Sequence, residues 1–202
     1  MDKMKAEPKN VLVIEEVQES FETWANQAFI SAETRELVLK SNLLLIPILG
    51  FRELPIPVFP VCTEELFQFI KETSPKEIVP EICIEEKDYK ELALHSALLI
   101  VGGFLVTALV APVAVDLIAE YIKRRFLKQS ENNVKAAKEI ILQEEAEKDE
   151  VKVELTVVEE SGKALKFSYE GPADDFRKNI NAALKASADK MPVGENPRKH
   201  LE

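Results

Sequence analysis

LALHSALLIVGGFLVTALVAPVAV, residues 92–115, contains no formally charged side chain, and the interpretation of the whole chain depends on the environment of this run. The motif DYKE at residues 88–91 precedes it as a capping-box-like pattern, which predicts a helix that begins near Tyr89. Continued to Lys128, this helix would be about 60 Å long at about 1.5 Å per residue, which exceeds the thickness of a bilayer. Pro112 is predicted to kink it, because proline has no N–H to donate to the preceding turn.

A membrane is the first environment that fits this predicted helix. Residues 92–118 have the length and the uncharged body of a spanning segment. The basic cluster of Lys123, Arg124 and Arg125 follows it and would contact anionic headgroups. We therefore expect an inner-membrane or membrane-associated protein if this interpretation holds.

The core of a protein in water is the second environment. Gly103, Thr107 and Ala111 lie four residues apart, so on a helix they would form one stripe of small residues where another helix packs closely. Such a stripe suits lipid and a helical core equally well. A third variant hides the helix in the core until assembly or a trigger releases it. The sequence leaves these alternatives open, and with the second the protein is expected in the cytoplasm.

The region before the apolar run predicts a strand–helix–strand unit. LLLIPIL at residues 43–49 and IVPEICI at residues 78–84 are typical of buried strands, and a helix is expected between them over residues 63–71. A strand–helix–strand order of this length favours parallel strands. Apolar residues recur at helical spacing over residues 15–40, and Ser31 can cap a second helix within this range. VLVI at residues 11–14 fits a short strand or the entry to a helix.

The region after the apolar run predicts a β-hairpin followed by a helix. VKVELTVV at residues 151–158 and ALKFSYE at residues 164–170 alternate apolar and polar side chains, with a turn at residues 161–162. A hairpin and one helix are too small to be stable alone. We expect this unit to dock on the N-terminal unit or to pair with other copies, which favours a homo-oligomer.

These elements predict an α+β fold. The expected divisions are an N-terminal α/β unit (1–87), a long apolar helix (88–128), a charged helical spacer (129–149), the hairpin and helix (150–190) and a disordered tail ending in a cloning scar (191–202).

Composition narrows the possible functions. The net charge of −10 argues against a nucleic-acid-binding surface. Cys62 and Cys83 are too few for a disulfide framework, and His95 has no second histidine or cysteine pair with which to hold a metal. No spacing of residues indicates a catalytic, cofactor or metal site. We therefore predict a protein that is not an enzyme.

One weak resemblance concerns the second half of the chain. An apolar helix that ends in IAEYIKRRF, a spacer, the hairpin KVELTVVEESGKALKFSYE and a closing helix resemble the effector-associated constant component modules of bacterial conflict systems. The resemblance covers roughly residues 92–185 and transfers no functional residue. It implies a module that couples a sensor or a protease-like switch to an effector in prokaryotic antiviral defence, together with a protein partner.

Two functional hypotheses follow. The first is a non-enzymatic, self-associating defence component that inserts into or is anchored to a membrane through residues 92–118. In it the N-terminal unit is regulatory and the C-terminal hairpin serves assembly. The second is a soluble α/β adaptor or small-ligand-binding module with residues 92–118 as its core helix.

Overall fold

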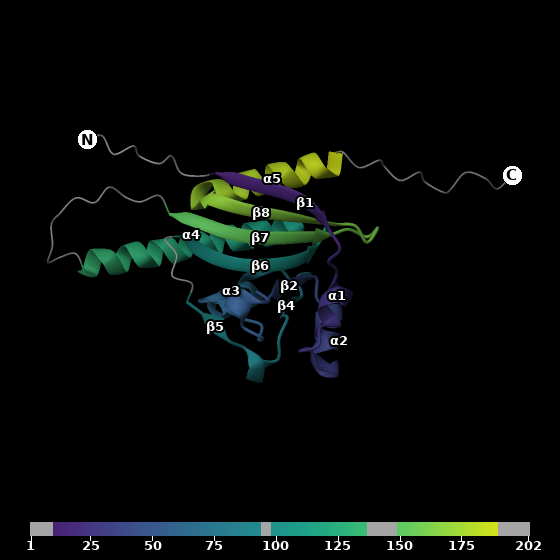
Figure 1. Ribbon diagram of the computed structural model, residues 1–202. Helices are drawn as coiled ribbons and strands as arrows, with labels where there is room; N and C mark the ends of the chain where they lie inside the picture. The colour runs from purple at the N-terminus through teal and green to yellow at the C-terminus, as the bar shows by residue number, and fades with distance from the viewer. Residues whose placement is uncertain (1–9, 94–97, 137–148, 190–202) are drawn as a thin grey trace.

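The protein is built on one mixed six-stranded sheet, in the strand order β1-β8-β7-β6-β2-β4 (Figure 1). The computed structural model describes residues 10–93, 98–136 and 149–189. The sheet strands are β1 (Val11–Val17), β2 (Leu43–Ile46), β4 (Pro80–Ile82), β6 (Leu99–Thr107), β7 (Glu150–Val158) and β8 (Ala164–Pro172). The helices are α1 (Phe21–Ala25), α2 (Ala32–Lys40), α3 (Thr63–Thr73), α4 (Ala111–Ala136) and α5 (Ala173–Asp189). Two short strands, β3 (Phe59–Pro60) and β5 (Glu91–Leu92), pair with each other. The predicted α+β class is confirmed.

The prediction of one long apolar helix over residues 88–128 is wrong. Residues 86–88 form a 3-10 turn, β5 follows, and the middle of the apolar run is the nine-residue strand β6. No helix in the part of the chain that the structure describes is long and apolar enough to cross a membrane. Helix α4 begins only at Ala111, so Pro112 stands in its first turn, where no hydrogen bond is lost and no kink results.

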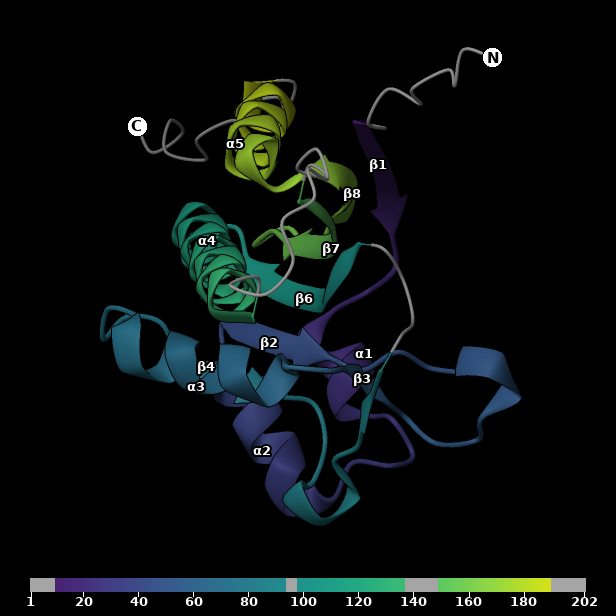
Figure 2. The same ribbon diagram turned by 90° about the vertical axis from the view of Figure 1, so that its left-hand side faces the viewer.

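Strand β6 is uncharged because both of its faces are covered. It lies between β7 and β2, and Phe104 and Val106 enter the core cluster beneath α3, α4 and α5. Leu105 points to the other face and packs with Trp24 and Val38 of α1 and α2. Figure 2 shows α5, α4 and α3 following one another along one side of the sheet. A strand buried on both faces is apolar at successive positions and does not alternate.

The strand–helix–strand unit is confirmed, since β2 and β4 are parallel and α3 connects them. The hairpin of β7 and β8 with the closing helix α5 is confirmed as well. The hairpin docks on its own chain, because β8 pairs with β1 and β7 pairs with β6. The expected N- and C-terminal units therefore share one sheet. Residues 129–136 of the expected spacer belong to α4, whereas residues 137–148 and the tail at 191–202 lie outside the described residues.

Candidate functional site

The three residues predicted to form a helical packing stripe do not share a helix. Gly103 and Thr107 lie in β6, and Ala111 is the buried first residue of α4. A Cβ built on Gly103 would lie 2.8 Å from Cγ1 of Ile46, its cross-strand neighbour in β2. The small residue at 103 is therefore explained by close packing between two strands of the sheet.

The predicted membrane-flanking cations lie on α4, and two of the three are engaged by other side chains. Arg124 pairs with Glu120 at 2.9 Å and lies 4.8 Å from the ring centroid of Phe69. Arg125 donates to Sγ of Cys62 at 3.2 Å. Lys123 is exposed on the same helix. Two of these cations thus hold α4 against neighbouring side chains.

A polar cluster that the sequence did not predict closes the N-terminus of α3. The Glu91 carboxylate of β5 accepts from the backbone N–H of Cys62 at 3.0 Å and of Glu64 at 2.9 Å. It also accepts from the Tyr89 hydroxyl at 2.6 Å. Partial burial opposes ionisation of Glu91, but these hydrogen bonds hold the pKa of its carboxyl below the usual value. Because these N–H groups are already bonded, the cluster acts as a helix cap supplied from a distant strand.

Cys62 is held in this cap in a form that disfavours nucleophilic chemistry. Its backbone is left-handed, with φ at 75°, and its carbonyl accepts from the Tyr121 hydroxyl at 3.2 Å. Burial raises the pKa of the Cys62 thiol, even though Arg125 lowers it. The thiolate is the reactive form of cysteine, so a raised pKa leaves a weak nucleophile.

Among the described residues, an open cleft of about 770 Å³ lies beside the edge strand β4. Residues from α2, α3, β4 and the segment 84–89 line it. Its apolar lining consists of Leu37, Phe67, Ile82, Ile84 and Tyr89. Its carboxylates are Glu33, Glu64, Glu81, Glu85 and Glu86, and its cations are Lys71 and Lys87. The cleft thus combines an apolar floor with an acidic rim.

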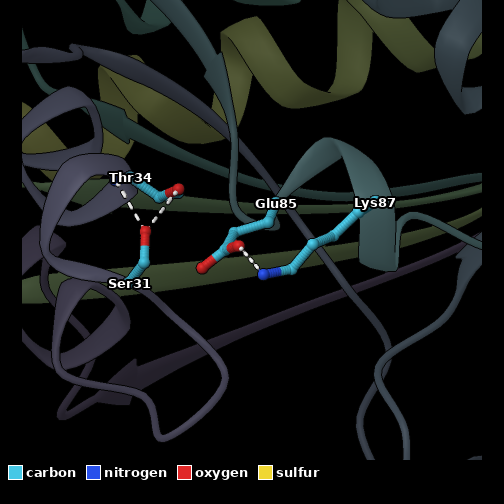
Figure 3. Close-up of polar contacts among 4 residues, drawn as sticks. All are labelled: Ser31, Thr34, Glu85 and Lys87. Carbon is cyan, nitrogen blue, oxygen red and sulfur yellow. Dashed lines mark hydrogen bonds and ion pairs between the residues drawn. The ribbon is translucent and has the colours of Figure 1, made fainter.

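Local hydrogen bonds order one side of this cleft (Figure 3). Ser31 caps α2, as the sequence predicts, because its Oγ accepts from the backbone N–H of Thr34 at 3.2 Å. Glu85 pairs at 2.8 Å with Lys87, two residues later in the same segment. Hydrogen bonds from Lys87 and Ser31 lower the pKa of the Glu85 carboxyl. This carboxylate is therefore ionised near neutral pH and adds to the negative charge of the rim.

The floor of the cleft already accepts a cation. The Lys71 ammonium lies 5.1 Å from the ring centroid of Phe67, within the range of a cation–π contact. Lys71 and Lys87 can balance the charge of two of the five lining carboxylates, so three negative charges remain in excess. The arrangement favours a ligand that carries both apolar and cationic groups.

Among the residues that the structure describes, no group of three or more His, Cys, Asp or Glu side chains is placed to hold a metal ion. His95 lies outside those residues. Comparisons of the chain with protein-family models, with curated proteins and with solved structures found no match. Of the elements on which the resemblance to conflict-system modules rests, the hairpin of β7 and β8 and the closing helix α5 are present, whereas the middle of the expected apolar helix is the strand β6. A role in prokaryotic defence stays a prediction.

Proposed function

We propose that this chain is a non-enzymatic α/β adaptor that binds a basic, amphipathic segment of a partner protein in the cleft between α2, α3 and β4. The observation that carries the proposal is the combination of an apolar floor with an excess of carboxylates at the rim. Long basic side chains match this combination, because their aliphatic stems lie on apolar surface while the charged ends reach outward.

The distribution of the lining residues favours an extended ligand over a compact one. Glu33 comes from the first turn of α2, Glu64 from the first turn of α3, and Glu86 from the turn that precedes β5. Phe67 and Ile84 line the same cleft and are themselves largely buried. A peptide segment with apolar and basic residues in alternation suits both the carboxylates and these apolar residues.

The contribution of the rim charges is modest for each pair and larger in sum. An exposed ion pair contributes about 0.2–1 kcal/mol, and reversing a charge replaces the attraction by a comparable repulsion. Reversing two rim carboxylates is therefore expected to cost about 2 kcal/mol, which corresponds to a roughly thirtyfold weaker Kd.

The test uses a short fluorescein-labelled peptide of alternating Lys and Leu, followed by fluorescence anisotropy. The unmodified chain is expected to bind it, with an affinity that falls as salt is added. The double variant Glu33→Lys with Glu86→Lys is expected to bind about thirtyfold more weakly. Both side chains are exposed, so the fold should persist, which a thermal melt monitored by circular dichroism checks.

A matched control separates the cleft from the overall negative charge. Glu22, in the first turn of α1, and Glu160, in the turn between β7 and β8, are exposed and do not line the cleft. Glu22→Lys with Glu160→Lys changes the net charge by the same amount and is expected to leave the affinity within about twofold. Equal weakening by both pairs, or no binding of the peptide by the unmodified chain, would contradict the proposed function.

A further inference from the structure

Strand β1 forms one edge of the sheet and, among the described residues, pairs only with β8. Its seven residues pair in continuous antiparallel register. Three of its apolar side chains are well exposed: Val11 by 43%, Val13 by 49% and Ile14 by 45%. A regular edge strand of this kind offers an unpaired row of backbone donors and acceptors to another strand.

The opposite edge of the sheet, β4, is closed to such pairing. Pro80 has no N–H, and the N–H of Ile82 donates to the side chain of Glu81 at 2.9 Å. The N–H of Ile84 turns back to the carbonyl of Ile82 at 2.9 Å. Proline and charged side chains are the usual means by which proteins block an edge. Strand β1 contains no proline, so the two edges differ in their capacity to pair.

The hairpin shows which backbone groups of β1 point away from the sheet. Glu159 donates its N–H to the carbonyl of Lys163 at 2.9 Å, and bonded and non-bonded pairs alternate along an antiparallel ladder. By this alternation the odd-numbered residues of β8 bond to β7, so its even-numbered residues, including Ser168, turn their backbone N–H and C=O groups toward β1. Val13 lies opposite Ser168, and its backbone therefore bonds to β8. The N–H and C=O of Leu12 and Ile14 therefore point outward.

We propose that two copies of this chain associate through β1, with the two strands antiparallel around a two-fold axis at Val13. Leu12 then lies opposite Ile14 of the partner subunit and exchanges both backbone hydrogen bonds with it. Val13 faces Val13 of the partner subunit in a non-hydrogen-bonded pair.

The second copy is the occupant because β1 is complementary to itself in this register. Leu12 and Ile14 lie on one face of β1 and Val13 on the other, so apolar cross-strand pairs form on both faces of the joined sheet. Glu15 lies opposite Val11 of the partner subunit, which keeps the Glu15 carboxylates of the two copies from facing each other. A two-fold interface uses the same surface on both subunits, as this register requires. The proposal goes beyond the cleft and does not depend on it.

A cysteine at the axis tests the register directly. Opposed Cα atoms in a non-hydrogen-bonded antiparallel pair lie about 4.5 Å apart, a separation that a disulfide spans. Val13→Cys is therefore expected to form a covalent dimer, of twice the 22.8 kDa chain mass, when treated with copper phenanthroline. Val11→Cys is the matched control: it has similar exposure on the same face, but its two copies would lie about 13 Å apart. Cross-linking of Val13→Cys should be at least about tenfold faster than that of Val11→Cys or of the unmodified chain with Cys62 and Cys83.

Sedimentation equilibrium tests the association without a cross-link. The unmodified chain is expected to approach twice its mass as its concentration rises. Val13→Asp places two carboxylates opposite each other and should raise the dimer dissociation constant about tenfold or more. Leu39→Asp on α2, at a side chain that is 44% exposed, should leave it unchanged. A chain that stays monomeric at all concentrations, or a Val13→Cys that cross-links no faster than Val11→Cys, would overturn the proposal.

Discussion

Replacing Gly103 by alanine tests whether this residue belongs to a packed strand or to a helix, because the two placements predict opposite signs. In the sheet, the added Cβ would lie 2.8 Å from Cγ1 and 3.2 Å from Cδ1 of Ile46. Ile46 is β-branched and restricted at χ1, so it cannot move aside freely. Forcing an extra methyl group into such a contact costs about 1–3 kcal/mol.

The net effect is smaller than this steric cost. Exchanging glycine for alanine reduces the entropy of the unfolded chain, which stabilises by about 0.4–1 kcal/mol. Gly103→Ala is therefore expected to lower the free energy of unfolding by about 1–2 kcal/mol. In the interior of a helix, the same substitution would instead stabilise by about 1 kcal/mol.

Urea denaturation followed by tryptophan fluorescence and by circular dichroism measures this free energy. The double variant Gly103→Ala with Ile46→Ala removes the opposing atoms, so it should be about 1 kcal/mol more stable than the sum of the single effects predicts. Stabilisation by Gly103→Ala, or single effects that add within about 0.5 kcal/mol, would refute the reasoning that close approach to Ile46 requires glycine.

Two further predictions concern the apolar run and the cap of α3. Leu105→Asp should prevent cooperative folding in a thermal melt, because a carboxylate would be buried without a partner, whereas Leu109→Asp, at 89% exposure in the same run, should change stability by less than about 0.5 kcal/mol. Glu91→Gln should cost about 1 kcal/mol near neutral pH. The pKa of Glu91 is lowered on folding, so its contribution is present above the unfolded pKa and is lost as pH falls through the folded pKa. Urea titrations across this acid range should show a steeper loss of stability for the unmodified chain than for Glu91→Gln.

Elements with strong local signals were predictable from the sequence. The hairpin alternates apolar and polar residues on both strands, and Gly162 adopts a φ of 83° in its turn, a conformation that favours glycine. Ser31 caps α2 because its side chain accepts a hydrogen bond from the backbone N–H of Thr34, three positions later. Helix α3 was predictable from apolar residues at helical spacing, and the two strands that flank it were predictable from short continuous apolar runs. Each of these signals lies within a few residues and needs no distant partner.

The candidate cleft was not predictable, because its residues come from separate parts of the sequence. Ser31 and Glu33 stand at the start of α2, Glu64 at the start of α3, and Glu85 and Glu86 after β4. The sequence shows an acidic N-terminal half but no spacing that brings these carboxylates together. The same holds for Glu91, which caps a helix that begins almost thirty residues earlier.

The sequence alone was enough to predict that a parallel strand–helix–strand unit precedes the uncharged run at residues 92–115 and that a hairpin with a helix follows it. That the middle of this run is a strand became clear only from its neighbours in the folded chain. A uniformly apolar run carries no periodicity, so helix and buried strand look alike in it. The choice was made by β2 and β7, which supply hydrogen bonds along both edges of β6, and by the helices that cover both of its faces.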